Sequence, residues 1–130
     1  VIGYSTFGMQ HLLEPCLDFI PKYIEYFSSI LNTSFPHTKI HMLFTSQTNM
    51  CAVLSNIFVF PASILCSKRN VIQMHKNYRL YAVALSDYVF GSLIRPRTIA
   101  DLWLICGIGR FIYYNFIKNF FGISEYYHVF

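Results

Sequence analysis

The residues that could do acid–base, nucleophilic or metal chemistry are few and widely spaced. Of 130 residues, six are Asp or Glu, five are His and four are Cys. No Cys-x-x-Cys pair occurs, and His37 and His41 fall on a predicted turn and strand, where a four-residue spacing does not bring them together. Ser86 and Asp87 have no histidine in register and make no catalytic triad. We expect buried free thiols at the four cysteines: Cys16, Cys51, Cys66 and Cys106.

A second chemical feature is a long stretch with basic residues and no acidic ones. No Asp or Glu occurs between Tyr26 and Ser86. Four basic residues lie in the loop before the helix predicted from residue 71 and in its first turns: Lys68, Arg69, Lys76 and Arg79. Such a field of one sign attracts an acidic partner, either nucleic acid or an acidic protein. The alternative is a solvated basic face whose counter-charges lie elsewhere in the protein.

The elements that must position these residues follow from hydrophobic spacing and chain breakers. In chain order we predict a loop over 1–9, a helix over 10–32, strands over 38–45, 52–54 and 57–60, a loop over 61–70, helices over 71–91 and 98–120, and a last helix from residue 124. Thr98 with Asp101 forms a capping-box pattern, and Gly122 ends the helix before it. The predicted fold class is α+β, a small sheet packed on several helices, with Tyr78, Tyr81 and Tyr88 in the core.

The composition raises the question of what covers the apolar surface. Apolar residues make up 55% of the chain and charged residues only 12%, which excludes disorder and leaves few charges to cover a small domain. The chain therefore lies in a membrane or is part of a longer protein. Polar residues and Pro61 interrupt the uncharged stretch 40–67, and Arg110 lies within the apolar stretch 102–117, which argues against a membrane helix. The missing initiator Met favours a fragment.

Two runs in the second half of the chain resemble one enzyme family. Residues 82–91, Ala-Val-Ala-Leu-Ser-Asp-Tyr-Val-Phe-Gly, are similar to the zinc helix of the aminopeptidase N (gluzincin) family, which reads H-E-x-x-H and ends in Trp-Phe-Gly. Residues 101–107 resemble the family's Asp-Leu-Trp-Leu-Asn-Glu-Gly, which carries the third zinc ligand. Eighteen residues separate Asp87 from Cys106, the family's own spacing. The resemblance implies a thermolysin-like (zincin) fold, with residues 1–130 as the central part of an aminopeptidase-like domain.

The family's chemical residues are absent from the matching positions. Val83 replaces the first His, Ala84 the general-base Glu, Asp87 the second His and Cys106 the third ligand. Ser55 replaces the Glu that anchors the amino terminus of a substrate. Because a catalytic zinc needs three protein ligands and a base, the resemblance implies no enzyme activity and no cofactor. Asp87 and Cys106 are a relic pair or, as we expect, ordinary buried residues.

The valine at the first ligand position leads to a prediction about packing. Val83 lies one helical turn from Asp87, so both face the direction that a zinc ion would occupy. With no ion there, we expect Val83 to be buried against the helix that bears Trp103 and Cys106.

The non-catalytic relatives of that family include aminopeptidase-like TBP-associated factors, subunits of the general transcription factor TFIID. Residues 121–128, Phe-Gly-Ile-Ser-Glu-Tyr-Tyr-His, resemble their Phe-Gly-Val-Asn-Glu-Tyr-Arg-His, and residues 107–113 resemble their Gly-Ile-Ser-Gly-Tyr-Ile-Tyr. This resemblance implies a nuclear, non-catalytic subunit that contacts promoter DNA, TBP and other TBP-associated factors, and that lies in no membrane. The alternatives are another zinc-less pseudo-enzyme and an active or membrane-anchored metallo-aminopeptidase relative.

Overall fold

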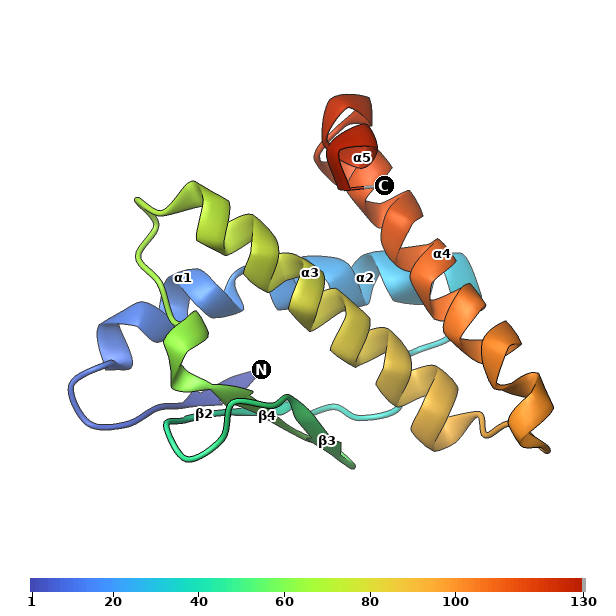
Figure 1. Cartoon of the computed structure of the whole chain (residues 1–130), viewed down its shortest axis with the longest axis horizontal. Coiled ribbons are helices and arrows are strands. Elements are labelled where there is room, and N and C mark those ends of the chain that lie inside the picture. Colours follow the sequence, from blue (N-terminus) through green and yellow to red (C-terminus); the bar gives the residue numbers. More distant parts are fainter. Residues whose placement is uncertain (130) are drawn as a thin grey trace. The chain divides into compact units, whose positions relative to one another are not determined.

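The computed structural model describes residues 1–129, except for the side chains of Ser92, Leu93 and Val129. The chain forms two compact units, residues 1–84 and the residues from Leu85 onward. The first unit contains a four-stranded sheet and the helices that cover it, and the second is helical (Figure 1). The fold class α+β is therefore confirmed.

The sheet has three parallel strands and one antiparallel edge strand. Its order is β1 (Ile2–Tyr4), β2 (His41–Thr45), β4 (Ile57–Pro61) and β3 (Ala52–Leu54). β1 pairs with β2 and β2 with β4 in parallel, whereas β3 and β4 form an antiparallel hairpin. Ser55 begins the two-residue hairpin turn with a φ of 52°, a left-handed conformation that such tight turns require.

The strand at the amino terminus was not predicted. Residues 1–9 were expected to form a loop, but Ile2–Tyr4 forms β1 and pairs with His41–Leu43. Three residues are too few to show an alternating pattern, and the partner strand lies about forty positions away in the sequence. The pairing of β1 depends on tertiary structure, which local spacing does not report.

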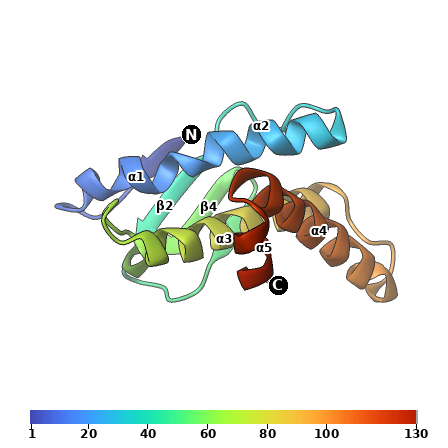
Figure 2. The same cartoon turned by 90° about the horizontal axis from the view of Figure 1, so that it is seen from above.

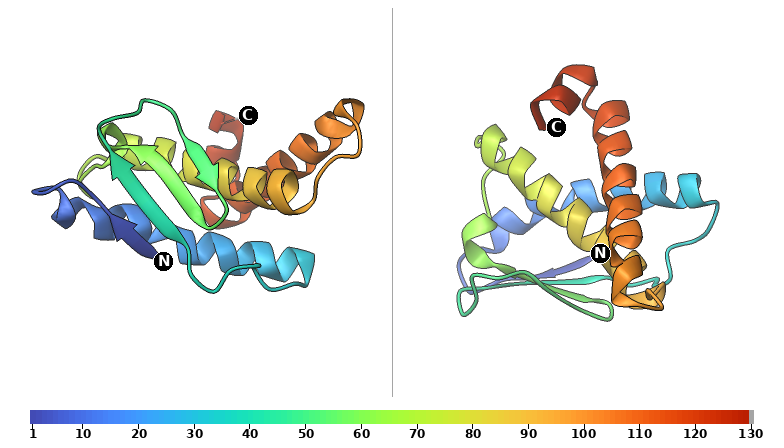
Figure 3. Two further views of the ribbon diagram at one scale, coloured as in Figure 1. Left: turned by 90° about the horizontal axis from the view of Figure 1, so that it is seen from below. Right: turned by 45° about the vertical axis from the view of Figure 1, so that its right-hand side comes forward.

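All helices of the first unit cover one face of the sheet. They are α1 (Leu13–Leu17), α2 (Phe19–Leu31) and α3 (Val71–Asp87) up to Ala84, with the short 3₁₀ turns Gln10–Leu12 and Ala62–Ile64. Seen from above, α1 and α2 follow one another over the sheet with α3 beside them (Figure 2), and from below the other face of the sheet is open (Figure 3). Met42, Phe44 and Phe58 point to the helices and are buried, whereas Leu43 and Ile57 point away and are exposed.

Two prolines break the helix that was predicted over residues 10–32. Pro15 is the third residue of α1 and Pro21 the third residue of α2. Because a proline is tolerated in the first turn of a helix and not in its interior, each marks a new helix start. Asn32 ends α2 in the left-handed conformation, with a φ of 47°. The predicted end of this segment is thus confirmed, and its continuity is corrected.

The second unit contains the end of α3, a wide helical turn and two further helices. The turn, Tyr88–Leu93, closes with a bond from the Ile94 N–H to the Val89 carbonyl, so it is π-helical and extends past the predicted end at residue 91. A short 3₁₀ turn, Ile99–Asp101, leads into α4 (Leu102–Phe120), and α5 (Ile123–Val129) follows.

The predicted signals around α4 are confirmed. The Thr98 hydroxyl and backbone N–H both donate to the Asp101 carboxylate, at 2.8 and 3.2 Å, which is the predicted capping box. Gly122, with a φ of 97°, ends the helix.

Candidate functional site

The four residues matched to the family's zinc site differ in exposure. Ala84 is buried, Val83 is half-buried, and Asp87 and Cys106 are exposed. The expectation that Asp87 and Cys106 are ordinary buried residues is therefore wrong, and Val83, which was expected to be buried, is only half-buried.

The Asp87 carboxyl is influenced by one basic residue of its own unit. Partial desolvation raises the pKa of this carboxyl above its ordinary value, and the positive charge of Arg110 on α4 acts in the opposite direction. This influence of Arg110 on Asp87 was not predicted from the sequence.

The described residues contain no group of three or more His, Cys, Asp or Glu side chains arranged to hold a metal ion. The four cysteines are free thiols. Cys16 and Cys66 are buried as predicted, whereas Cys51 and Cys106 are exposed and contradict the prediction. Cys51 directly precedes the short edge strand β3 and Cys106 lies on the outer part of α4, where nothing in their units covers them.

A buried polar cluster inside the first unit was missed by sequence reasoning. Asn77, on the inner side of α3, donates from Nδ2 to the Ile64 carbonyl and to Cys66 Sγ, and accepts a 3.0 Å bond from Gln73. The Cys16 thiol donates to the Cys66 carbonyl at 3.6 Å. Burial raises the pKa of the Cys66 thiol to about 11, with a smaller contribution from Cys16. The cluster is therefore a set of protonated, hydrogen-bonded core groups that ties α3 to the chain before it.

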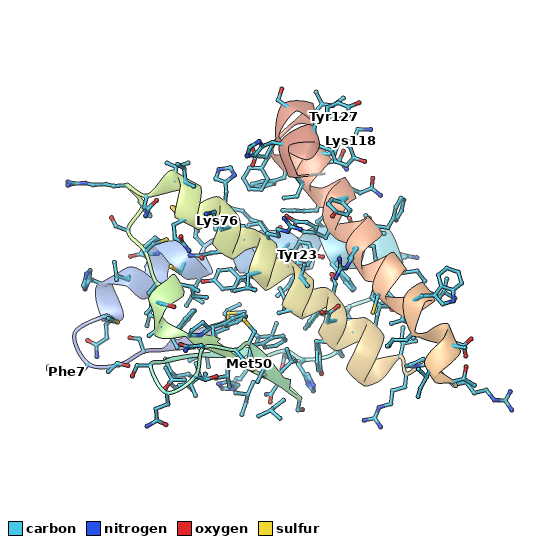
Figure 4. The ribbon with its side chains drawn as sticks, viewed as in Figure 1. Phe7, Tyr23, Met50, Lys76, Lys118 and Tyr127 are labelled. Carbon is cyan, nitrogen blue, oxygen red and sulfur yellow. The ribbon has the colours of Figure 1, made fainter. Side chains whose placement is uncertain are left out.

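The four predicted basic residues are all exposed, in agreement with their placement off the core stripe of α3. We call Lys68, Arg69, Lys76 and Arg79 the basic surface. Lys68 and Arg69 lie in the turn before α3, where Ser67 Oγ accepts from the Arg69 N–H and Asn70 Oδ1 caps the helix by accepting from the Gln73 N–H. Lys76 and Arg79 lie on α3 itself (Figure 4). Within the described residues none of the four makes an ion pair, so their charges are available to a partner.

The segment matched to the family's substrate strand is at the edge of the sheet. Ala52–Leu54 forms β3, which pairs on one side only, with β4. Ser55, at the position of the family's amino-terminus anchor, is exposed in the hairpin turn. A serine hydroxyl carries no charge, so it cannot neutralise the ammonium group of a bound peptide.

An apolar surface on α4 was also missed, although its signal is present in the sequence. Leu104, Ile108 and Phe111 recur at helical spacing and are all exposed, Phe111 to 66%. The composition indicated uncovered apolar surface without locating it, because periodicity indicates that a helix has an apolar face and does not show what covers that face. No described helix is both long and apolar enough to cross a membrane.

Comparison with known proteins supports the resemblance drawn from the motifs. No family model matches the chain. TFIID subunit 2 of Danio rerio and of Gallus gallus are each 25% identical to it over 118 residues, 90% of the chain. TFIID subunit 2 of Schizosaccharomyces pombe is 27% identical over 127 residues, 97% of the chain. The chain spans about a tenth of the length of these relatives. The chain is thus related to TFIID subunit 2, and the expected resemblance to a TFIID subunit is confirmed.

Proposed function

We propose that the chain is part of a non-catalytic subunit of a TFIID-type general transcription factor, built on an inactive aminopeptidase-like scaffold. One observation carries the proposal. The chain is similar to TFIID subunit 2 over at least 90% of its length, and it holds Val83 and Ala84 where the aminopeptidase motif holds a ligand and a base. In this role it works in the nucleus, with TBP and other TBP-associated factors, in core-promoter recognition and assembly of the RNA polymerase II preinitiation complex.

The chemistry of the motif positions supports a role without catalysis. Valine has no lone pair for a metal ion, and alanine has no group to take a proton from an attacking water molecule. Asp87 and Cys106 can supply at most two metal ligands, whereas a catalytic zinc site needs three protein ligands and a general base. Serine in place of glutamate at position 55 removes the negative charge that would hold the amino terminus of a substrate. Each change acts on a different step of peptide hydrolysis, so restoring one would not restore the reaction.

The basic surface is the part of the chain that we propose for contact with promoter DNA. Four cations are spread from the turn before α3 to residue 79 of the helix, and the first unit offers them no ion-pair partner. Contacts of this kind bind phosphates without reading sequence. They weaken as the salt concentration rises, because releasing counterions from the DNA into a more concentrated solution is less favourable. An acidic segment of another TFIID subunit is the second candidate partner, because it would recognise the same charges.

The test uses the full-length protein assembled in its complex. Lys68, Arg69, Lys76 and Arg79 are changed together to Ser, and binding of a promoter fragment is measured across a salt series. Loss of phosphate contacts should weaken binding at all sequences and flatten the salt slope by about one unit per lost contact. A matched variant removes two Lys and two Arg elsewhere: Lys22, Lys39, Arg95 and Arg97 to Ser. Its slope should stay unchanged.

The outcomes separate the two candidate partners. An unchanged slope in the first variant excludes the DNA contact, and failure of that variant to co-assemble identifies the protein partner instead. If binding and assembly are both unchanged, the basic surface is a solvated face and the proposal for it fails.

Metal content and hydrolysis test the non-catalytic scaffold separately. We expect no stoichiometric zinc in the purified full-length protein and no hydrolysis of aminoacyl amides above a buffer control. One tightly held zinc ion per chain that is lost in the double variant Asp87→Ala, Cys106→Ala would overturn this part of the proposal.

A further inference from the structure

Two arginines precede Thr98 in the segment that joins the π-helical turn to α4. The segment reads Arg-Pro-Arg-Thr over residues 95–98, so the basic residues stand three positions and one position before the threonine. Arg95, Arg97 and Thr98 are exposed, and Pro96 is half-buried. The whole segment belongs to the second unit. It therefore presents a hydroxyl group next to two positive charges on the surface of that unit.

The backbone of this segment is extended at both of its ends. Ile94 has a φ of −101° and a ψ of 98°, and Thr98 has a φ of −131° and a ψ of 160°. Between them, Pro96 disfavours helical backbone in the preceding Arg95. Residues 94–98 belong to no helix or strand. Such a segment can enter the cleft of a modifying enzyme without the unfolding of a regular element.

The residue types around Thr98 select one class of modifying enzyme. A threonine hydroxyl can accept a phosphoryl group, and protein kinases choose their substrates by the pattern of charge around that hydroxyl. Arg95 and Arg97 suit a kinase whose peptide cleft carries carboxylates, because a guanidinium pairs with a carboxylate through two hydrogen bonds. Ile99 follows the threonine, so the segment lacks the proline that a proline-directed kinase requires after its target. The alternative is that the two arginines only keep this loop in water.

The Thr98 hydroxyl has a structural role that a phosphate would end. It donates to the Asp101 carboxylate at 2.8 Å, and the Thr98 N–H donates to the same carboxylate at 3.2 Å. A phosphate ester carries a charge of about −1.5 to −2 at pH 7, and its oxygens are acceptors. It cannot donate to Asp101, and it repels the carboxylate. Because Asp101 is exposed, its side chain can turn to water and release the Thr98 N–H.

We propose that Thr98 is a phosphorylation site for a protein kinase that selects basic residues before its target, and that the phosphate opens the capping box at the start of α4. In this step the Thr98 oxygen attacks the γ-phosphorus of ATP. A new O–P bond forms, the bond from the γ-phosphorus to the bridging oxygen breaks, and ADP leaves. The hydroxyl proton passes to the catalytic base of the kinase. The site shares no residue with the basic surface, so it does not depend on the proposed contact with DNA.

The test incubates the full-length protein with ATP and a calmodulin-dependent protein kinase, which selects Arg three residues before its target. Mass spectrometry follows the phosphate at Thr98, which should be modified. Arg95→Ala should lower the initial rate at Thr98 by about tenfold or more, the effect of removing a hydrogen bond between charged groups. The matched control is Lys39→Ala, which removes an exposed cation of the first unit and should leave the rate unchanged. Thr38, an exposed threonine with no arginine before it, should stay unmodified.

Hydrogen exchange tests the effect on the capping box. Phosphorylation should speed exchange of the Thr98 amide by about tenfold or more, because its N–H loses the bond to Asp101. Asp101→Ala removes the same bond, so in that variant the amide should exchange fast before modification and change little after it. Absence of phosphate at Thr98, an equal rate in the Arg95 variant or equal modification of Thr38 would overturn the kinase site. Unchanged exchange of the Thr98 amide after modification would overturn the opening of the capping box.

Discussion

The two units of the chain differ in how far the side chains of one helix are covered. In the first unit, Phe44 and Phe60 from the sheet pack against Tyr81 from α3, which is completely buried. Ring centroids of Phe60 and Tyr81 lie 5.1 Å apart in an edge-to-face arrangement. In the second unit, Tyr113 and Phe116 of α4 are buried, whereas Trp103 and Phe111 of the same helix are exposed. The high apolar fraction of the chain therefore has two origins, filled cores and a partly uncovered helix.

This difference shows that an apolar residue cannot be assigned to a core by its type. The sheet of the first unit provides a second layer for its helices, so inward positions are covered. The described residues of the second unit form no sheet, and its helices bury only the residues on their contact sides. The expected consequence is that substitutions at inward positions of the first unit lower stability, whereas those at the exposed positions of α4 change stability little.

The largest expected effect tests the filled core. Phe44→Ala should lower the free energy of unfolding by about 3–5 kcal/mol, because it removes a buried ring from between the sheet and α3. Leu43→Ala, at the neighbouring position that points away from the helices, should cost less than about 1 kcal/mol. Chemical denaturation followed by circular dichroism measures both. Similar costs at the two positions would contradict the inward and outward assignment of β2.

The next effect compares two neighbours on α3. Ala84→Asp should cost about 3 kcal/mol or more, because it places a carboxylate at a buried position without a partner. Val83→Asp should cost clearly less, because Val83 is half-buried and water can reach part of its surface. Thermal melting of the two variants ranks them. A larger cost at residue 83 would show that the first ligand position, and not the base position, faces the interior.

A smaller effect separates the packed and open sides of α4. Gly109→Leu should destabilise the second unit by about 1–3 kcal/mol, because the new side chain would collide with Ser86 and Phe90. Gly107→Leu should raise stability by about 0.5–1 kcal/mol, because it replaces a glycine in an open helix position with a good helix former. Hydrogen exchange at the amides of α4 reports both changes. The two substitutions should change the stability in opposite directions. Changes in the same direction would indicate that both glycines have the same environment.

The smallest expected effect is the pH dependence of folding stability that comes from the Asp87 carboxyl. Its folded-state pKa is raised above the ordinary 3.8, so ionisation of this carboxyl costs stability above the folded pKa, and the cost disappears below the unfolded one. Asp87→Asn should therefore stabilise the protein at pH 7, by less than about 0.5 kcal/mol at this exposed position, and have no effect below pH 3.8. Arg110→Gln should lower stability at pH 7 in the wild type and not in the Asn variant. Urea titrations at the two pH values measure the differences.

Much of the fold could be predicted from local signals. The capping box at Thr98, the stop at Gly122 and the αL turn at Asn32 each satisfy backbone groups within a few residues, so the sequence shows them directly. Strands β2, β3 and β4 were visible from their apolar runs. β1 was not, since its pairing with β2 forms across a distance of about forty residues. One continuous helix was predicted over residues 10–32, but a proline is tolerated only in the first turn of a helix. Pro15 and Pro21 therefore require two helices, each beginning just before its proline.

The residue types at the candidate site are visible in the sequence, but how exposed they are is not. That Val83 and Ala84 supply no ligand and no base remains a prediction from their side chains. The exposure of Asp87 and Cys106 depends on how α4 continues from the π-helical turn, which the sequence does not show. The Asn77 cluster could not be predicted either, because an asparagine within a helical pattern looks like a surface residue until its buried partners are known.

The parallel pairing of β1 with β2 has a consequence for the order in which the first unit folds. The hairpin β3–β4 needs only a two-residue turn, and β2 joins β4 across a short connection. β1 can join only after the chain through β2 is available and the intervening helices have folded back over the sheet, which closes a much longer loop. In pulse-labelling hydrogen exchange, amides of β1 should acquire protection after those of β4. During synthesis on the ribosome, β1 therefore lacks its partner β2 until residues 41–45 have been made.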